Sequence, residues 1–523
     1  MPRYFITTAI DYPNGLPHIG HAYEKVLADV IARYRRLRGD EVYFLTGVDQ
    51  HGQKMQQTAD REEVNVATLA QRNTRKFLSL WEKLGVHFDG WAATTDERHK
   101  ACVQKILTTL HDEGQLYKKA YRGFYSVRQE QYLTEKDRNE NGEFGSEWGE
   151  VIELEEENWY FKLSEHAEWL KEVVTSGELG IVPDFRRAEV LNAIERAGET
   201  DLCISRPKER LHWGIEIPFD PDFVTYVWFD ALINYISFAG YRADQERNDL
   251  PDFNTLWPAN AHVIGKDILV PAHSIYWPCM LRAMGFRNEE MPTLLVHGWW
   301  NIRGDKMSKS QGTVIDPSIL ADQYSVEAVR YYLVRDIVTG KDSNFDLERL
   351  ITLFNSELAN DLGNLLNRSL NMTKRFVGGE LTPGEYDDEA CSALRTSLAT
   401  STANYLAAMD EHDVPGALKA LNEHVVHCNQ FIEKNPPFEL RKDESQAPRV
   451  SAILVHLCES CTHLAVLLSP VLPEAATKIL SQLRAGELAP RTCDELKWGL
   501  LPAGHRIGKA KPVFPRIVRE QDE

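Results

Sequence analysis

The sequence is poor in cysteine and has no long apolar run. Its 523 residues include eight cysteines, too few for a disulfide framework in a chain of this length, so we expect reduced thiols. No apolar run approaches the roughly 20 residues that a bilayer crossing needs. The N-terminus leads from Met1 straight into a strand-like segment, without the apolar core of a signal peptide. We therefore expect a cytoplasmic protein with no membrane partner.

Only Cys458 and Cys461 form a C-x-x-C pair. They lie in an apolar, helix-like run, and the sequence has no second pair to complete a metal site. We therefore expect these two residues to be buried core thiols.

Positive charge is also scarce. The chain has 59 Lys and Arg against 78 Asp and Glu, a formal net charge of −19. Contacts to phosphates need local positive charge, so this balance argues against indiscriminate nucleic-acid binding. A limited basic face could still bind one specific nucleic acid.

The first ninety residues alternate between strand-like and helix-like patterns. Residues 3–9 are rich in β-formers, and residues 10–20 are turn-like. Apolar side chains recur at helical spacing in 21–37, and a second apolar run, 42–48, ends at the polar stretch 49–52. This order is typical of a βαβ unit, whose ligands bind beyond the carboxyl ends of the strands.

Later changes of pattern divide the chain into segments. We predict an α/β Rossmann-like nucleotide-binding fold, split by an inserted small domain and followed by an all-α helical bundle. The expected segments are 1–118 and 206–298 for the two halves of the nucleotide-binding domain, 119–205 for the insertion, 299–355 for a connecting segment and 356–523 for the helical domain.

The stretch Pro17-His18-Ile19-Gly20-His21 stands at the start of the first expected helix. His18 and His21 share a helical face, Gly20 lets a ligand approach the backbone, and a helix N-terminus favours anions. Two imidazoles there suit a polyphosphate in its transition state. A pair of capping histidines is the alternative, and this motif alone does not decide between them.

A second motif, Gly304-Asp305-Lys306-Met307-Ser308-Lys309-Ser310-Gln311-Gly312, is a glycine-bounded loop with two lysines. Lysine serves phosphates as a mobile point charge, and the flanking glycines would allow the loop to close. On its own, a solvated basic turn is the simpler interpretation.

Together, the two motifs resemble the paired signatures of class I aminoacyl-tRNA synthetases, in their order and in their placement. Within that class the chain resembles the methionyl-tRNA synthetase family from about residue 4 to residue 514. The stretches that carry this resemblance are AIDYPNG (9–15), TGVDQHG (46–52), YVWFDAL (226–232), IGKD (264–267) and NDLGN (360–364). The interval between the motifs is too short for the large editing insertion of the valine, isoleucine and leucine enzymes.

The resemblance implies a ligase. L-methionine and ATP, the latter with Mg²⁺, would give methionyl-adenylate and pyrophosphate. Methionine would then move to the 3′ end of tRNA(Met), initiator and elongator alike. A carboxylate is already a nucleophile, so catalysis should consist of positioning and charge stabilisation.

The resemblance also assigns residues. The catalytic groups are His18, His21, Lys306 and Lys309. The ATP-binding residues are Gly20, Glu24, Arg206, Asp267, Lys306, Ser308 and Lys309. The methionine site consists of Ile10, Tyr12, Asp49, Trp228, Tyr235, Ile268, His273 and Trp277, with Asp49 holding the substrate ammonium. A polarizable thioether between aromatic walls fits this set, although ordinary core packing would explain each aromatic on its own.

The chain departs from the family pattern in several places. Many relatives hold zinc in the inserted domain with cysteine pairs, but here Ser126 and Gln129 stand at the first pair, and no cysteine lies between 130 and 160. We expect no metal site and no structural zinc. Between Ile268 and His273 the chain is one residue longer than the pattern, which leaves their register open.

In the helical domain, Asn364 and Arg368 match the pair that reads the CAU anticodon, four residues apart on one helix face. Phe438 stands where a tryptophan is expected and still offers a stacking surface to an unpaired base. Surface residues without a partner are the alternative. The chain ends without the OB-fold appendage that dimerises some relatives, so the resemblance implies a monomer.

Three alternatives share part of this evidence. A cysteine or valine enzyme of the same class is disfavoured by the pocket aromatics. A catalytically silent tRNA-binding relative would have no reason to retain both motifs and Asp49. A small-metabolite nucleotidyltransferase would not need a helical domain.

Overall fold

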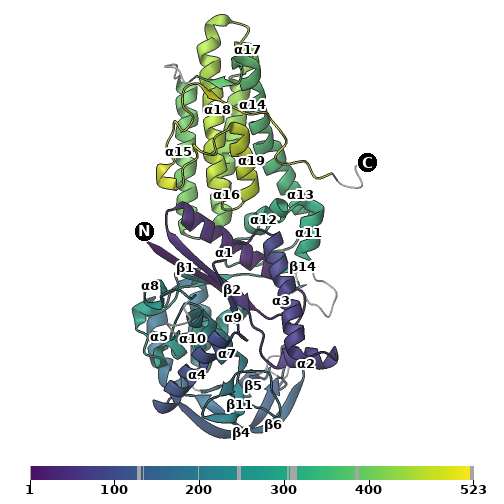
Figure 1. The fold of residues 1–523 in the computed structure, drawn as a ribbon, viewed down its shortest axis with the longest axis vertical. Coiled ribbons are helices and arrows are strands. Elements are labelled where there is room, and N and C mark those ends of the chain that lie inside the picture. Colours follow the sequence, from purple (N-terminus) through teal and green to yellow (C-terminus); the bar gives the residue numbers. More distant parts are fainter. Residues whose placement is uncertain are drawn as a thin grey trace.

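The computed structural model describes residues 2–126, 131–133, 135–139, 141–197, 200–243, 249–302, 305–306, 315–382 and 388–518. The molecule is elongated, with a helical bundle at one end, a parallel sheet in the middle and a small antiparallel sheet at the other end (Figure 1).

The central sheet has six strands in the order β3-β2-β1-β12-β13-β7, and every neighbouring pair is parallel. Its strands are β1 (Arg3–Asp11), β2 (Glu41–Val48), β3 (Gly90–Ala93), β7 (Ile181–Val182), β12 (Ala261–Gly265) and β13 (Leu294–His297). The strand order reverses between β1 and β12, and in such sheets the crevice beyond the carboxyl ends at this point is where ligands bind. The predicted Rossmann-like fold is confirmed.

Helices alternate with these strands along the chain and lie around the central and the small sheet (Figure 1). They are α1 (Ile19–Leu37), α2 (Gln53–Arg61), α3 (Val66–Lys83), α4 (Glu97–Asp112), α5 (Ala167–Ser176), α6 (Arg187–Ala197), α7 (Val227–Ser237), α8 (Phe253–Leu256), α9 (Lys266–Ile268) and α10 (Trp277–Ala283). Helix α1 was predicted over 21–37 and starts two residues earlier, directly after the capping residue His18.

The small antiparallel sheet has the order β5-β4-β6-β8. Its strands are β4 (Leu116–Ser126), β5 (Gln131–Leu133), β6 (Val151–Phe161) and β8 (Leu202–Cys203), and β9 (Ser205–Pro207), β10 (Glu216–Ile217) and β11 (Asp220–Thr225) form a further sheet. Within the predicted insertion, 119–205, the strand β7 pairs with β13 of the central sheet. The small sheet therefore uses only part of that segment.

A connecting segment joins the sheet to the bundle. It contains β14 (Trp300–Ile302), β15 (Asp305–Lys306), α11 (Pro317–Tyr324), α12 (Val326–Arg335), β16 (Ser343–Asn344) and α13 (Leu347–Leu353). The π-helical stretch η9 (Phe354–Gly363) continues α13 into the bundle.

The bundle consists of α14 (Asn364–Val377), α15 (Glu389–Asp410), α16 (Val414–Lys434), α17 (Pro437–Leu440), α18 (Ala447–Leu468) and α19 (Pro473–Leu483), with β17 (Glu380–Leu381) paired to β18 (His505–Arg506). Cys458 and Cys461 are buried in α18, as predicted. Although α18 is apolar enough to pass for a membrane span, 94% of its apolar window is buried inside the protein. The predicted helical region is confirmed.

Candidate active site

His18 and His21 cap helix α1 and stack on each other. The Gly20 N–H donates to His18 Nδ1, and the His18 N–H donates to His21 Nδ1, each at 3.1 Å. The ring centroids lie 3.7 Å apart. Each Nδ1 is an acceptor, so Nε2 carries the proton of the neutral ring. The two histidines therefore do cap the helix, and these hydrogen bonds orient both rings at the edge of the sheet where ligands bind in this fold.

Gly20 is needed for this arrangement. A Cβ atom added there would lie 3.0 Å from His18 Cε1. A side chain at position 20 would therefore press on the ring that caps the helix.

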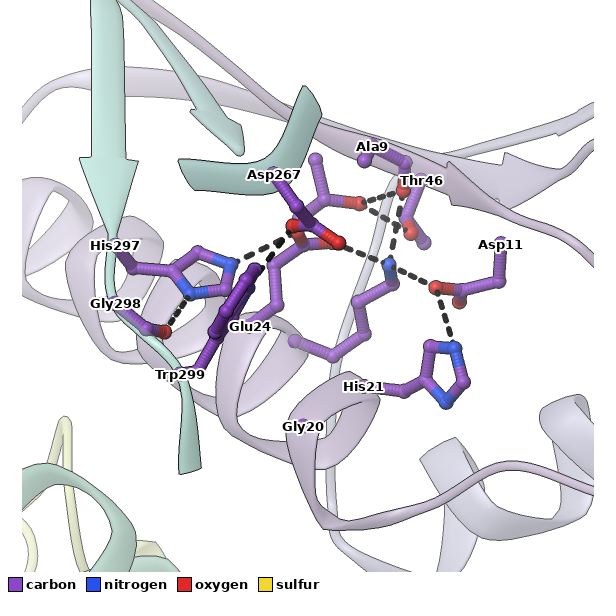
Figure 2. A network of polar contacts seen from close by, with 12 residues as sticks. Ala9, Asp11, Gly20, His21, Glu24, Thr46, Asp267, His297, Gly298 and Trp299 are labelled. Carbon is purple, nitrogen blue, oxygen red and sulfur yellow. Dashed lines mark hydrogen bonds and ion pairs between the residues drawn. The ribbon is translucent and has the colours of Figure 1, made fainter. Parts of the chain in front are cut away.

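A network of buried charges lies beside these rings (Figure 2). Lys25 is fully buried and donates to the Ala9 carbonyl and to Asp11 Oδ1 at 2.9 Å, and to Glu24 Oε1 at 2.6 Å. His297, at the end of β13, contacts Glu24 Oε2 at 3.0 Å. Burial would raise the pKa of Glu24, but Lys25 and His297 lower it below its usual value.

The predicted ATP-binding residue Asp267 follows β12, near Glu24 (Figure 2). The Trp299 indole donates to Asp267 Oδ1 at 3.1 Å, and the Lys266 ammonium lies 4.0 Å from the centroid of the Trp299 ring. The carboxyl ends of β1, β12 and β13 thus bring Glu24 and Asp267 to one edge of the sheet.

The predicted methionine pocket is organised around His273. The Tyr235 hydroxyl donates to His273 Nε2 at 2.7 Å, and His273 Nδ1 donates to the Ile268 carbonyl at 2.8 Å. Burial lowers the pKa of His273 to about 4, so the ring is neutral. Trp228 meets this ring edge-on, with 6.3 Å between the centroids.

Trp277 closes the same cluster. Its indole donates to His262 Nε2 at 3.3 Å, and its ring centroid lies 5.8 Å from that of Tyr235. Trp228 and Tyr235 both lie on helix α7, seven residues apart, which is about two turns.

The chain between Ile268 and His273 is kinked. Inside the stretch η6 (Leu269–Tyr276), Val270 has extended backbone angles (φ −113°, ψ 130°), which separate two helical pieces. After the kink, the Trp277 N–H donates to the Ala272 carbonyl, five residues back. The ring of His273 reaches across the kink to the Ile268 carbonyl. How this stretch aligns with the family pattern stays a prediction.

Asp49 lies at the carboxyl end of β2. Its N–H donates to the Asp11 carbonyl at 2.9 Å, and its Oδ1 accepts from the Thr94 hydroxyl at 3.2 Å and the His51 N–H at 3.3 Å. Ile10 and Tyr12 flank Asp11 and are partly buried against the same core cluster as Trp228. The loop after β2 is therefore tied to the end of β1.

Gly52 keeps this loop close to the predicted pocket. Its φ of 101° suits glycine, and a Cβ there would lie 2.0 Å from the Tyr12 hydroxyl. The stretch 46–52 therefore needs its terminal glycine for steric reasons.

Four of the predicted residues lie apart from these groups or are not fully described. Arg206 is buried on β9, where it donates to the Ser205 carbonyl at 2.6 Å and stacks on Tyr226 with 4.5 Å to the ring centroid. Its part in nucleotide binding stays a prediction. Lys306 ends β15, while Ser308 and Lys309 lie outside the described residues.

The chain that follows the second motif contacts the first. The Ile19 N–H, in the first turn of α1, donates to the carbonyl of Ile315 at 3.3 Å. Ile315 is the first described residue after the lysine loop. The chain at Ile315 therefore lies against the helix that His18 caps.

The sequence did not single out Asp230, although it lies within 226–232. His51 Nδ1 contacts its Oδ2 at 2.7 Å, and His99 Nε2 contacts its Oδ1 at 2.8 Å. Burial would raise the pKa of Asp230, but the two histidines hold it below its usual value. This carboxylate fixes the loop next to Asp49. The sequence feature that could have identified Asp230 is its position as an acidic residue in an otherwise apolar motif.

The predicted anticodon residues lie on the bundle. Asn364 is exposed and Arg368 half-buried at the start of α14, immediately after η9. Phe438, on α17, leaves 52% of its surface exposed. An exposed phenylalanine of this kind can stack on a base.

Comparisons with known proteins point to one family. The model for class I tRNA synthetases (M) matches residues 4–142 and 147–370, and the model for the anticodon-binding domain of methionyl tRNA ligase matches residues 382–523.

Curated relatives match the chain along its whole length. The methionine–tRNA ligase of Fusobacterium nucleatum is 36% identical over 528 residues, covering 100% of this chain and 81% of the relative. That of Clostridium perfringens is 38% identical, covering 99% and 78%.

Solved structures agree with these relatives. The Mycobacterium tuberculosis methionyl-tRNA synthetase in complex with methionyl-adenylate superimposes with a TM-score of 0.90 at 36% identity, covering 99% of this chain and 100% of that one. The chain therefore belongs to the methionine–tRNA ligases of the class I aminoacyl-tRNA synthetase family.

Proposed function

We propose the following roles in the reaction of this family, in which L-methionine and ATP give methionyl-adenylate and methionine is then moved to tRNA(Met). The Asp49 carboxylate binds the substrate ammonium. The thioether lies against the aromatic groups around the neutral His273. The remaining wall residues are Ile10, Tyr12, Trp228, Tyr235, Ile268 and Trp277. A polarizable sulfur against aromatic rings supports this assignment.

ATP lies over the first turn of α1. The Nε2–H groups of His18 and His21, together with Lys306 and Lys309, stabilise the charge that develops on the phosphates when the methionine carboxylate attacks. Gly20, Glu24, Asp267, Arg206 and Ser308 complete the nucleotide site. Mg²⁺ accompanies the triphosphate and offsets its charge, and we assign it no protein ligand.

One observation carries the proposal: the Ile19–Ile315 hydrogen bond of 3.3 Å ties the chain after the lysine loop to the helix capped by the histidines. This contact supports the assignment of both phosphate-binding motifs to one site. The test is ATP–pyrophosphate exchange with each proteinogenic amino acid in turn. We expect exchange with methionine alone, and exchange with a different amino acid would overturn the pocket assignment.

The bundle binds the anticodon through Asn364, Arg368 and Phe438. Since a stacked base or a base-edge contact is worth about 1–3 kcal/mol, Asn364→Ala should lower kcat/KM for tRNA charging about tenfold and leave pyrophosphate exchange unchanged. The matched control is Asn367→Ala on the same helix, because Asn367 bonds to Asn371 at 2.8 Å. Equal effects of the two variants would contradict the assignment.

We further propose that the chain acts as a cytoplasmic monomer on initiator and elongator tRNA(Met), with no structural zinc in the segment 119–205. Light scattering tests the oligomeric state, and metal analysis of the purified protein tests the absence of zinc. Stoichiometric zinc would contradict the last point.

A further inference from the structure

The ammonium of Lys25 connects two parts of the active site. Its three hydrogen-bond acceptors are the Ala9 carbonyl and Asp11 Oδ1 at the end of β1, and Glu24 Oε1 on α1. A lysine ammonium has three donors, so these contacts use all of them. Burial alone would lower the pKa of Lys25, but Asp11 and Glu24 raise it above its usual value. Lys25 is therefore a buried cation that joins β1 to α1.

Asp11 is only half satisfied. Its Oδ1 accepts from Lys25 and lies 4.0 Å from His21 Nε2, but its buried Oδ2 has no hydrogen-bond partner among the described residues. Burial raises the pKa of Asp11 to about 7, although Lys25 acts in the opposite direction. An unsatisfied buried carboxylate oxygen costs free energy, so stability alone does not account for this pair.

The geometry shows what the pair can do. Side chains alternate along a strand, so Asp11 points toward α1, where it contacts Lys25, while Ile10 points the other way. Ile10 and Tyr12 pack against the core cluster that holds the residues of the proposed methionine pocket. The Asp11 carbonyl also accepts the Asp49 N–H at 2.9 Å. Fixing Asp11 from the α1 side therefore fixes the backbone that carries the pocket wall and orients Asp49.

We propose that Lys25 and Asp11 are positioning residues for methionine, holding the end of β1 so that Asp49 meets the substrate ammonium. Asp11 ties the pair to the methionine half of the site, whereas Glu24, another acceptor of Lys25, belongs to the proposed nucleotide site. This inference rests on the proposed role of Asp49.

The test is a double-mutant cycle in ATP–pyrophosphate exchange, with Lys25→Met, Asp11→Asn and the double variant. Lys25→Met takes the cation away from Asp11 and from Glu24, so KM for methionine should rise at least tenfold. KM for ATP should rise less, because Glu24 keeps its contact with His297. Removing Asp11 as well takes away the unpaired charge, so the double variant should recover most of this loss. Coupling of about tenfold is typical of directly bonded residues.

The control is Lys83→Met. Lys83 bonds to the Ser318 carbonyl at 3.0 Å and its hydroxyl at 2.8 Å, and pairs with Asp322, outside the site. It should leave both KM values unchanged. Additive effects in the cycle, or an unchanged KM for methionine in folded Lys25→Met, would overturn the proposal. If Lys25→Met does not fold, Asp11→Asn decides by itself: methionine affinity measured by calorimetry should fall, and an unchanged affinity would overturn it.

The variant Asp49→Asn distinguishes a failure of the proposed role of Asp49 from a failure of the positioning role of Lys25 and Asp11. If it leaves KM for methionine unchanged, the proposed role of Asp49 fails. If it raises that KM while Lys25→Met does not, only the positioning role fails.

Discussion

Two buried cations make contacts at helix α1, and their hydrogen-bond partners are satisfied differently: Lys25 lies on the helix, and Arg330 packs against it. Lys25, in the site, leaves Asp11 Oδ2 without a partner among the described residues. Arg330, on α12, lies at the joint with the bundle. It donates to Asp29 of α1 at 2.7 Å and to the carbonyls of Leu84, Pro470 and Val471 at 2.9–3.1 Å.

The carboxylate at the joint is also complete. Asp29 Oδ2 accepts from Arg33 at 2.8 Å as well as from Arg330, and its Oδ1 accepts from the His87 N–H at 2.9 Å. Both oxygens of Asp29 at the joint therefore have hydrogen-bond partners, whereas Asp11 Oδ2 in the site has none among the described residues. Departures from complete polar pairing are expected at functional sites.

The largest expected effect on stability is at the joint. Arg330→Met leaves Asp29 without its main partner and three carbonyls without a donor, so it should lower the free energy of unfolding by about 3–5 kcal/mol. Urea unfolding measures this loss. A loss below about 1 kcal/mol would show that the joint is not held by this cation.

A substitution in the lysine loop should instead lower activity without lowering stability. Lys309→Ala should lower the rate of adenylate formation by about 10²–10³, the effect of losing one donor to a developing charge, and leave the free energy of unfolding unchanged. Single-turnover kinetics measures the rate. An unchanged rate would remove Lys309 from the catalytic groups.

The pocket should make stability depend on pH. His273 has a pKa of about 4 in the folded protein against 6.5 ordinarily, so the unfolded chain binds more protons between these values. The contribution of the neutral His273 ring to the free energy of unfolding is therefore complete above pH 6.5. It is lost as the pH falls toward 4, by up to about 3 kcal/mol. Unfolding of His273→Asn should show a shallower slope between pH 6.5 and 4. An identical slope would contradict the neutral, buried ring.

A smaller effect is expected from Tyr34, at the other end of α1. Its hydroxyl contacts Asp410 Oδ1 at 2.8 Å, so Tyr34→Phe should cost about 1 kcal/mol. The matched control is Tyr405→Phe at the same interface, because the buried Tyr405 hydroxyl has no partner in the described part of the chain. Thermal unfolding of both variants checks this, and equal losses would count against the hydrogen bond.

Much of this site could be predicted from the sequence. Helical spacing and the capping motif gave α1 within two residues, and the family resemblance brought together His273, Tyr235 and Trp277. Lys25 could not be found in this way, because a charged residue in a helix is ordinarily exposed. Its burial depends on Asp11 and Ala9, which only the packing of β1 against α1 brings near.

The stretch before His273 shows the same limit. The sequence indicated one residue too many there, but an additional residue can be absorbed by a loop, a bulge or a π turn. In the structure, a kink at Val270 separates Ile268 from His273, and the ring of His273 reaches back to the Ile268 carbonyl. Residue spacing along the chain does not predict that kink.

The most direct measurement compares Lys25→Met and Arg330→Met side by side, at a temperature at which both are folded. For each variant, methionine-dependent ATP–pyrophosphate exchange gives KM, and urea gives the free energy of unfolding. We expect Lys25→Met to raise KM for methionine at least tenfold and Arg330→Met to leave it unchanged while losing about 3–5 kcal/mol of stability. If KM for methionine rises in proportion to the loss of stability in both variants, the distinction between the site and the joint is wrong.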